Sequence, residues 1–211
     1  MSGTVATAVA ARVGKGALTR DRILRSAADL FHAQGVNATT LGEVLRASDA
    51  GKGQFYQHFE DRDALVQAVL GRHRVYLREH APPLRSWTDL RAWMDVHVDA
   101  MRSFGFRRGC PVGTAAYALQ PDQDAARAEL RAIFAEMRDR LREFLSAERE
   151  AARLRPDADA SRLATFCVAA VQGGLLLALV ERRPEPVRSS IAEAFKHLQS
   201  YIRRPSPRRR A

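Results

Sequence analysis

The sequence predicts an all-α fold, with a small N-terminal three-helix unit followed by a larger helical domain. Apolar residues recur at spacings of three and four through nearly the whole chain, and no β-hairpin pattern interrupts them. Of the 211 residues, 46% are hydrophobic, which suffices for a core and excludes a disordered chain. The two cysteines, Cys110 and Cys167, are too few for a disulfide scaffold or a cysteine-based structural zinc site.

Four helices are expected in the N-terminal part, over about residues 19–34, 40–47, 52–59 and 61–80. Gly35 suits the backbone that ends the first of them. Thr40 and Glu43 form a capping-box pattern at the start of the second. Acidic residues at 60–61 favour the start of the fourth through the helix dipole, and the prolines at 82–83 end it.

In the C-terminal part, apolar stripes predict helices over about residues 90–101, 122–153 and 163–180, and a last one that begins near Pro186. A loop is expected over 105–113, in which Cys110 precedes a helix start at Pro111. The longest near-apolar run, 166–180, is shorter than the roughly 20 residues of a membrane span. Without a secretory signal pattern, the expectation is a soluble, cytoplasmic protein with no membrane partner.

The net charge of +10 lies mainly at the two ends of the chain. Residues 1–18 carry bases and no acid, and residues 203–211 carry five arginines with two prolines between them. We expect two flexible basic arms. They suit either sequence-independent attraction to phosphate or plain solvation of the termini, and both interpretations stay open.

Residues 39–65 carry a helix-turn-helix pattern, in which two short helices are separated by a tight break at 48–50. In such a unit the second helix enters the major groove of DNA. Phe55 and Phe59 lie four residues apart and therefore point inward together. The remaining side chains of this helix are polar or basic, with no acid among residues 52–59, as binding beside phosphates requires.

At these residues the sequence resembles the TetR family of bacterial transcriptional repressors. The likeness rests on Thr39-Thr40, Val44-Leu45, Lys52-Gly53-Gln54-Phe55-Tyr56, Phe59, Arg62 and Leu65, and on the first helix from Ile23 to Gly35. The turn departs from the family pattern, since Asp49, Ala50 and Gly51 replace the usual Gly, Val and Ser. Asp tolerates a left-handed backbone, so we expect the turn to persist, with a less well anchored recognition helix.

The resemblance implies a double-stranded DNA operator as partner. It assigns phosphate contacts to Thr40, Lys52, Tyr56 and Arg62, and base contacts to Gln54 and His58. Packing of the Tyr56 ring on the three-helix core is an alternative, as is an ordinary surface position for His58.

For the second half, the resemblance implies a ligand-binding and dimerisation domain. Residues 107–113 and 172–178 look like those of regulators of multidrug export and detoxification. Aromatic and methionine side chains suggest an adaptable apolar pocket for a small-molecule effector, although an ordinary core stripe explains each of them singly. The pocket candidates are Trp93, Met94, His97, Met101, Phe104, Tyr117, Phe134, Met137 and Phe166.

A homodimer is also expected, because the helix over 163–180 is apolar nearly all round and must be covered on every side. The alternative is a helix that is central in a monomer. The candidate interface residues are Cys167, Val171, Gly174, Leu177, Ile191, Phe195 and Leu198.

Cys110 follows two arginines and precedes a helix start, both of which lower a thiol pKa, so a redox or electrophile sensor is suggested beside an inert alternative. The histidines show no metal-binding spacing, and neither a cofactor nor an enzymatic motif is expected.

The expected function is therefore a ligand-responsive repressor that binds a palindromic operator as a dimer and is released by a small apolar or electrophilic effector. The alternatives are an architectural, sequence-blind DNA-binding protein, a helical small-molecule carrier or enzyme, and a membrane-surface role for the arginine-rich tail. The expected organisation is a basic arm over 1–18, a DNA-binding domain over 19–65, a connecting helix over 66–81, a ligand-binding and dimerisation domain over 82–202, and a basic tail over 203–211.

Overall fold

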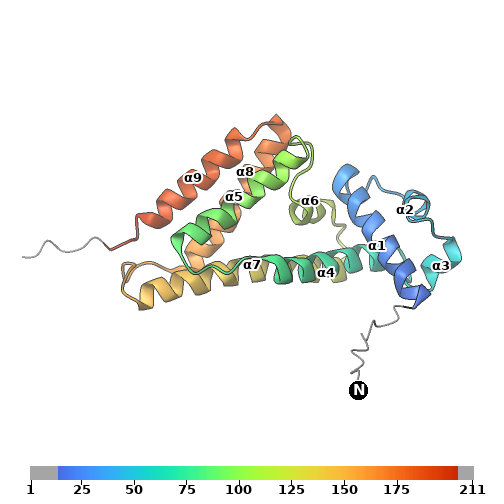
Figure 1. Ribbon diagram of the computed structural model, residues 1–211, viewed down its shortest axis with the longest axis horizontal. Helices are drawn as coiled ribbons and strands as arrows, with labels where there is room; N and C mark the ends of the chain where they lie inside the picture. Colours follow the sequence, from blue (N-terminus) through green and yellow to red (C-terminus); the bar gives the residue numbers. More distant parts are fainter. Residues whose placement is uncertain (1–13, 204–211) are drawn as a thin grey trace, which may run out of the picture.

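The computed structural model describes residues 14–203, and every regular element in that range is a helix (Figure 1). Most of the expected basic arms, residues 1–13 and 204–211, lies outside the described residues. The helices are α1 (Lys15–Gln34), α2 (Leu41–Ala47), α3 (Lys52–Tyr56), α4 (Arg62–His80), α5 (Trp87–Ser103), α6 (Pro111–Ala118), α7 (Asp124–Glu150), α8 (Ala160–Glu181) and α9 (Glu185–Gln199).

The local signals that predicted the N-terminal helices act as expected. Thr40 caps α2 and forms both bonds of the capping box with Glu43, and the Asp61 side chain caps α4 by accepting from the Ala64 amide at 2.7 Å. Two helix ends differ from the expectation. α1 begins at Lys15 rather than near residue 19, and α3 ends at Tyr56, after which the amide of Phe59 still bonds to the Phe55 carbonyl at 2.9 Å as a turn.

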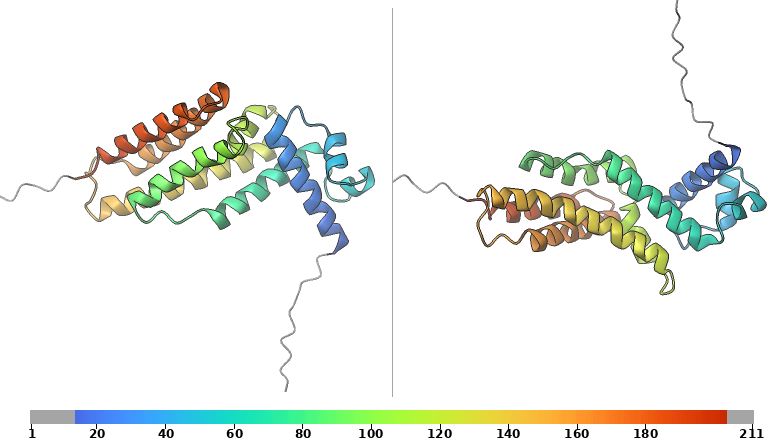
Figure 2. Two further views of the ribbon diagram at one scale, coloured as in Figure 1. Left: turned by 45° about the horizontal axis from the view of Figure 1, so that its top comes forward. Right: turned by 90° about the horizontal axis from the view of Figure 1, so that it is seen from below.

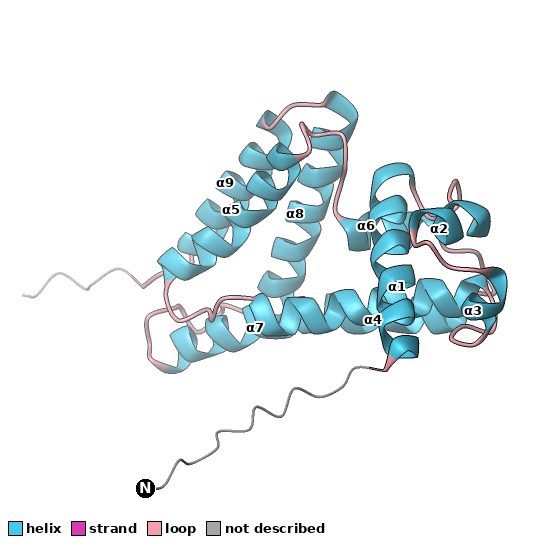
Figure 3. Cartoon of the chain, turned by 45° about the vertical axis from the view of Figure 1, so that its right-hand side comes forward, coloured by secondary structure: helices cyan, strands magenta, loops and turns pink. Residues whose placement is uncertain are grey.

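The helices form two groups joined by the long helices α4 and α7, which run alongside each other (Figures 1 and 3). α1, α2 and α3 gather at one end of the molecule, and α5, α8 and α9 pack side by side at the other (Figure 2). α6 lies between the two groups and contacts both α1 and α7. A single antiparallel bridge within the described residues, Leu154 to Ile202, ties the α7–α8 turn to the end of α9.

Two hydrophobic clusters form the core. The smaller one is built on Ile23, Val44, Phe55 and Leu65 but extends beyond the first four helices, because it also includes Val112, Ala126, Leu130 and Ile133 from α6 and α7. The larger one is built from α5, α7, α8 and α9. Cys110, Phe134 and Met137 contact both clusters, so the two cores adjoin.

α8 is longer than the sequence suggested. It has 22 residues and contains an 18-residue window with a mean hydropathy of 2.2, so by length and composition it could cross a membrane, which corrects the expectation of a run too short to do so. The core helix of a soluble protein meets the same criterion, and one face of α8 is indeed buried against α7 and α9. Its other face, here called the α8 outer face, is exposed and consists of Phe166, Ala169, Gly173, Leu176, Leu177 and Val180.

Candidate nucleic-acid interface

α3 is held by its two phenylalanines. Phe55 and Phe59 are 0% and 4% exposed, and their ring centroids lie 5.3 Å apart in the smaller core. Burying this side of the short helix turns its polar side toward solvent. The exposed residues, here called the α3 outer face, are Lys52, Gly53, Gln54, Tyr56 and Gln57.

Gln54 has a role that the sequence did not suggest. Its side-chain Oε1 accepts a hydrogen bond from the Gly51 amide at 2.8 Å and so caps the start of α3. This bond is the half of a capping box in which the N3 side chain accepts from the N-cap amide, while the half that a Ser side chain would supply is missing because Gly51 has no side chain. The amide nitrogen of Gln54 remains available as a donor on the α3 outer face.

The turn before α3 keeps its shape despite the Asp in place of Gly. Asp49 has φ of 48°, the left-handed conformation expected for it. The buried Ser48 hydroxyl donates to the Val44 carbonyl at 2.7 Å, and Arg22 donates to the Asp49 carbonyl at 3.4 Å. The turn between α2 and α3 is therefore held by a hydrogen bond from α1 as well as by a local one.

Lys52 and Tyr56 lie together on the α3 outer face. Tyr56 is 52% exposed, and the edge of its ring packs against the core residue Phe55, so packing on the three-helix core and a contact to phosphate are both compatible with its position. The Lys52 Nζ lies 6.0 Å from the centroid of the Tyr56 ring, within reach of a weak cation–π interaction. A cation and a phenol hydroxyl are thus presented one helical turn apart.

Thr40 is exposed but its hydroxyl is engaged in the α2 cap. It accepts from the Glu43 amide at 3.2 Å and donates to the Glu43 carboxylate at 2.8 Å. The hydrogen bond from the Thr40 backbone amide, followed by that from its hydroxyl, lowers the pKa of Glu43. A phosphate that approached Thr40 would therefore meet an ionised carboxylate next to it.

Two of the residues expected to contact DNA have other neighbours in the structure. The Arg62 guanidinium donates to the carbonyls of Val36 and Thr39, the latter at 3.4 Å, and so fixes the α1–α2 connection. His58 is half-buried against the first turn of α1, where a methyl group on Gly16 would lie 3.5 Å from its Cε1. Neither side chain belongs to the α3 outer face. Gln57, which was not singled out as a base reader, does.

The nine pocket candidates do not converge on one cavity. Trp93, Met94 and Met101 are buried in the larger core, and Phe134 and Met137 join the two cores. In contrast, Phe104, Tyr117 and Phe166 are 41%, 78% and 44% exposed. The expectation of a pocket lined by all nine is therefore corrected.

His97 is the pocket candidate with the most altered chemistry. It lies beside Trp93, with ring centroids 5.2 Å apart. Burial lowers its pKa to about 4, so the imidazole is uncharged at neutral pH.

Most of the residues expected at a dimer interface are buried in their own chain. Cys167, Val171, Gly174, Ile191 and Leu198 belong to the packing of α8 against α7 and α9. A Cβ on Gly174 would lie 2.8 Å from that of Ser190, so this glycine permits the crossing of α8 and α9 within one chain. Burial also raises the pKa of Cys167 to about 12. Phe195 is half-buried, and only Leu177 is exposed, at 51%.

Cys110 stands at the start of α6, followed by Pro111 at the first helical position as expected. Its side chain is half-buried, and the Sγ accepts a weak hydrogen bond from the Gln172 Nε2 at 3.6 Å. Over residues 14–203, no group of three or more histidine, cysteine or acidic side chains is placed to hold a metal ion.

Two family models match the chain. The model for bacterial regulatory proteins of the tetR family matches residues 23–69, and that for the tetracyclin repressor-like C-terminal domain matches residues 87–194. Among curated relatives, an uncharacterized HTH-type transcriptional regulator of Mycobacterium tuberculosis is 31% identical over 180 residues, which cover 80% of this chain and 88% of the relative. The HTH-type transcriptional repressor DhaR of Mycobacterium sp. strain GP1 is 25% identical over 85% of this chain and 91% of its own length.

Solved structures agree with this fold. Regulatory protein TetR from Rhodobacter sphaeroides superposes with a TM-score of 0.76 at 24% identity, covering 85% of this chain and 98% of that one. The reduced form of Escherichia coli NemR has a TM-score of 0.78 at 22% identity, covering 90% of this chain and 99% of that one.

A cysteine mutant of the TetR-family regulator CifR, complexed with 26-base-pair operator DNA, has a TM-score of 0.70 at 25% identity and covers 84% of this chain and 95% of that one. The family models cover both the helix-turn-helix unit and the helical domain that follows it, and full-length relatives match in sequence and fold. The chain therefore belongs to the TetR family of transcriptional regulators, DNA-binding proteins that carry a C-terminal ligand-binding domain.

Proposed function

We propose that this protein is a cytoplasmic repressor that binds a palindromic operator as a homodimer and leaves it when a small apolar or electrophilic effector binds. The observation that carries the proposal is the α3 outer face, a set of basic, amide and phenol side chains fixed on a buried pair of phenylalanines. Donors of this kind suit phosphates and base edges in the major groove. The operator complex of the related CifR supports the same use of the fold here.

The α8 outer face supports pairing with a second copy. Phe166, Leu176, Leu177 and Val180 are 44%, 42%, 51% and 72% exposed along one side of a single helix. A continuous apolar stripe of this kind favours association, and a two-fold pairing makes the patch meet itself. Such a dimer carries two copies of α3, as reading of two half-sites about 34–36 Å apart requires.

Release by an effector requires that the effector bind the DNA-incompetent arrangement more tightly than the competent one. α4 is the connection that we propose to transmit this preference. Arg74 reaches the carboxylates of Glu136 at 2.6 Å and Glu129 at 3.5 Å, and Arg78 also pairs with Glu136. Through these ion pairs, a tilt of α7 also moves α4 and, with it, the helices α1, α2 and α3. The thiol of Cys110, between the two cores, is the nucleophile that we propose to react with an electrophilic effector.

The proposal is tested by fluorescence anisotropy on the DNA upstream of the gene and on a random duplex of equal length. We expect the double variant Gln54→Ala/Gln57→Ala to lower the ratio of specific to random affinity by about tenfold or more. Gln199→Ala, an exposed position at the end of α9, is the matched control and should leave the ratio unchanged. An unchanged ratio in the double variant would instead favour sequence-blind binding.

A further inference from the structure

A cavity of about 180 Å³ lies at the junction of α1, α4 and α6, here called the junction cavity. Its walls are mainly apolar and include Phe31 from α1, Val66, Val69 and Leu70 from α4, and Ala115 from α6. None of the nine side chains expected to bind a ligand lines it. An engineered apolar cavity of about 150 Å³ in another protein holds a benzene molecule, so the junction cavity is large enough for a single aromatic ring.

Two imidazoles face the junction cavity from opposite elements. His32 on α1 is held by a 2.9 Å hydrogen bond between its Nε2 and the Gly109 carbonyl, in the loop before α6. His73 on α4 has no hydrogen-bond partner within residues 14–203, although it is half-buried. Its ring nitrogens are not among the fully buried polar atoms of residues 14–203, so water reaches them, and a ligand with a matching donor or acceptor can take the place of that water.

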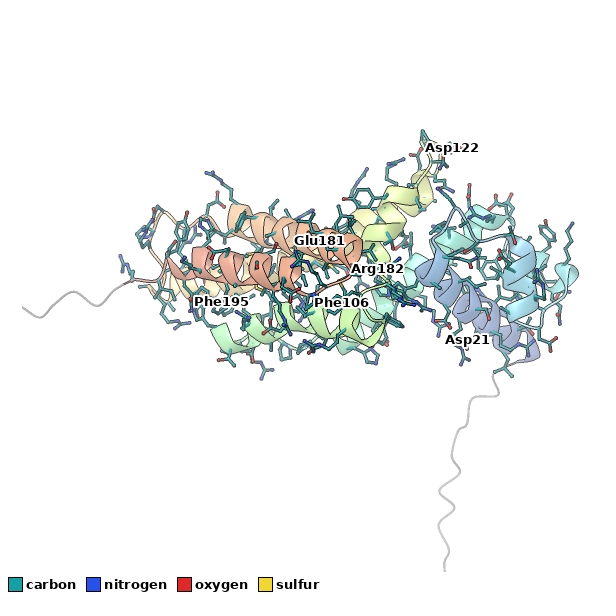
Figure 4. All side chains as sticks on the ribbon, turned by 90° about the horizontal axis from the view of Figure 1, so that it is seen from above. Asp21, Phe106, Asp122, Glu181, Arg182 and Phe195 are labelled. Carbon is teal, nitrogen blue, oxygen red and sulfur yellow. The ribbon has the colours of Figure 1, made fainter. Side chains whose placement is uncertain are left out.

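The charge at the cavity favours an uncharged molecule. Burial, and to a smaller extent the neighbouring His32, lowers the pKa of His73, so its ring offers one donor and one acceptor without a net charge. The cation that lines the cavity, Arg72, is paired with Asp21 at 2.7 Å (Asp21 is labelled in Figure 4). An anionic ligand would therefore find its counter-charge already occupied.

Tyr76, which also lines the cavity, belongs to a row of aromatic rings on α4. Tyr76, 54% exposed, stacks on His73 with centroids 6.3 Å apart and on His80 with centroids 4.2 Å apart. A row of stacked rings of this kind offers both face and edge contacts to a further aromatic ring.

We propose that the junction cavity binds a small uncharged aromatic molecule that carries one hydroxyl or ring N–H, such as a phenol or an indole, with its polar atom on His73. Pro111 and Ala115 form one wall from α6, while α1 and α4 form the others. An occupant thus touches both the helix-turn-helix unit and the helix that separates it from the larger core. Any effect of this occupant on operator affinity rests on the proposed function, whereas the binding itself does not.

Binding is tested on the full chain by calorimetry and ligand-observed NMR, with phenol and indole as probes, toluene as the apolar analogue and benzoate as the charged one. We expect phenol and indole to bind with a dissociation constant on the order of 0.1–1 mM. Benzoate should bind at least about tenfold more weakly because no free cation meets it. Absence of phenol binding at several millimolar, or equal binding of benzoate, would overturn the proposal.

Variants locate the site. Ala115→Leu fills the cavity and should weaken phenol binding by about tenfold or more, whereas Ala116→Leu, an exposed position on the same helix, should not change it. His73→Phe keeps a ring and removes the hydrogen bond, so phenol should lose about two- to tenfold in affinity while toluene keeps its own. Because His73→Phe does not fill the cavity, it also serves if Ala115→Leu fails to fold. Phenol affinity unaltered in both variants would contradict the assignment.

Operator affinity is measured separately in the same samples. Loss of operator recognition in every sample would overturn the proposed repressor function and leave the binding result intact. Phenol binding that His73→Phe and Ala115→Leu both weaken supports the site whatever the operator assay gives.

Discussion

The backbone amide of Gly51 donates to the side-chain Oε1 of Gln54 at 2.8 Å, so a residue of the α3 outer face also caps the helix that carries it. Stability and recognition can therefore be separated at one position. Gln54→Glu keeps an acceptor at the same place and should leave the free energy of unfolding within about 0.5 kcal/mol of the wild-type value. It should nevertheless weaken operator binding by about tenfold or more, since it places a negative charge against phosphates.

Gln54→Ala removes the cap and should lower the free energy of unfolding by about 1 kcal/mol, as measured by urea denaturation. Gly51→Ser restores a capping hydroxyl and, combined with Gln54→Ala, should recover most of that loss. If Gln54→Ala unfolds at the wild-type urea concentration, the bond contributes nothing to α3.

Asp49 is held at φ of 48°, a conformation that costs free energy for any residue with a Cβ atom. Asp49→Gly should therefore raise the free energy of unfolding by about 0.5–1 kcal/mol. The same substitution at Asp99, within the regular helix α5, is the matched control and should lower the free energy of unfolding by about 0.3–0.5 kcal/mol. Thermal unfolding of the pair measures both, and a loss of stability in both variants would refute the strain argument.

Arg62 and Lys52 should respond differently to truncation. Arg62→Ala leaves the carbonyls of Val36 and Thr39 without their donor and should lower the free energy of unfolding by about 1–2 kcal/mol. Lys52→Ala, at an exposed position, should leave stability unchanged but reduce the slope of log affinity against log salt by about one. Salt titrations of operator affinity beside urea curves separate the two roles. If the urea curve of Arg62→Ala equals that of the wild type, the phosphate-binding role would be favoured for Arg62.

The α8 outer face is expected to mediate dimerisation. Leu177→Glu places a charge within the apolar stripe and should shift the protein to monomers in sedimentation equilibrium, with little loss of monomer stability because the residue is 51% exposed. Val96→Glu on α5, where the residue is 52% exposed, is the matched control and should leave association unchanged. Dimers that persist in Leu177→Glu would place the interface elsewhere.

His97 should make stability depend on pH. Its pKa falls from 6.5 to about 4 in the folded protein, so between these values the unfolded chain binds more protons. The contribution is complete above about pH 6.5 and is lost as the pH falls toward 4. With allowance for partial exposure, the loss should be on the order of 2 kcal/mol. The free energy of unfolding, taken from urea curves at pH 7.5 to 4.5, should depend less on pH for His97→Gln than for the wild type. An equal dependence on pH in the two proteins would contradict the assignment.

The sequence predicted those features that depend on neighbours along the chain. The capping box of Thr40 with Glu43, the left-handed Asp49 and the inward pair Phe55 and Phe59 all follow from local spacing, and the structure confirms them. These interactions span no more than four residues. Local geometry alone therefore determines them.

Features that depend on distant partners were not predictable. Arg62 donates to carbonyls 26 and 23 residues away, and His58 lies against Gly16 in α1. Likewise, the sequence of a helix that is apolar on all sides, such as α8, does not indicate which face packs against the rest of its own chain. For this reason the interface candidates Cys167, Ile191 and Leu198 proved to be core residues, while neighbours such as Leu176 and Val180 are exposed.

The residues that touch both cores have a consequence for how the molecule comes apart. Phe134, Met137 and Cys110 belong to neither cluster alone, and the smaller cluster draws Val112, Leu130 and Ile133 from α6 and α7. A fragment that ends after α4 would lack these residues of its hydrophobic core. The helix-turn-helix unit should therefore unfold together with the rest of the chain in one calorimetric peak, and it should be insoluble when expressed by itself.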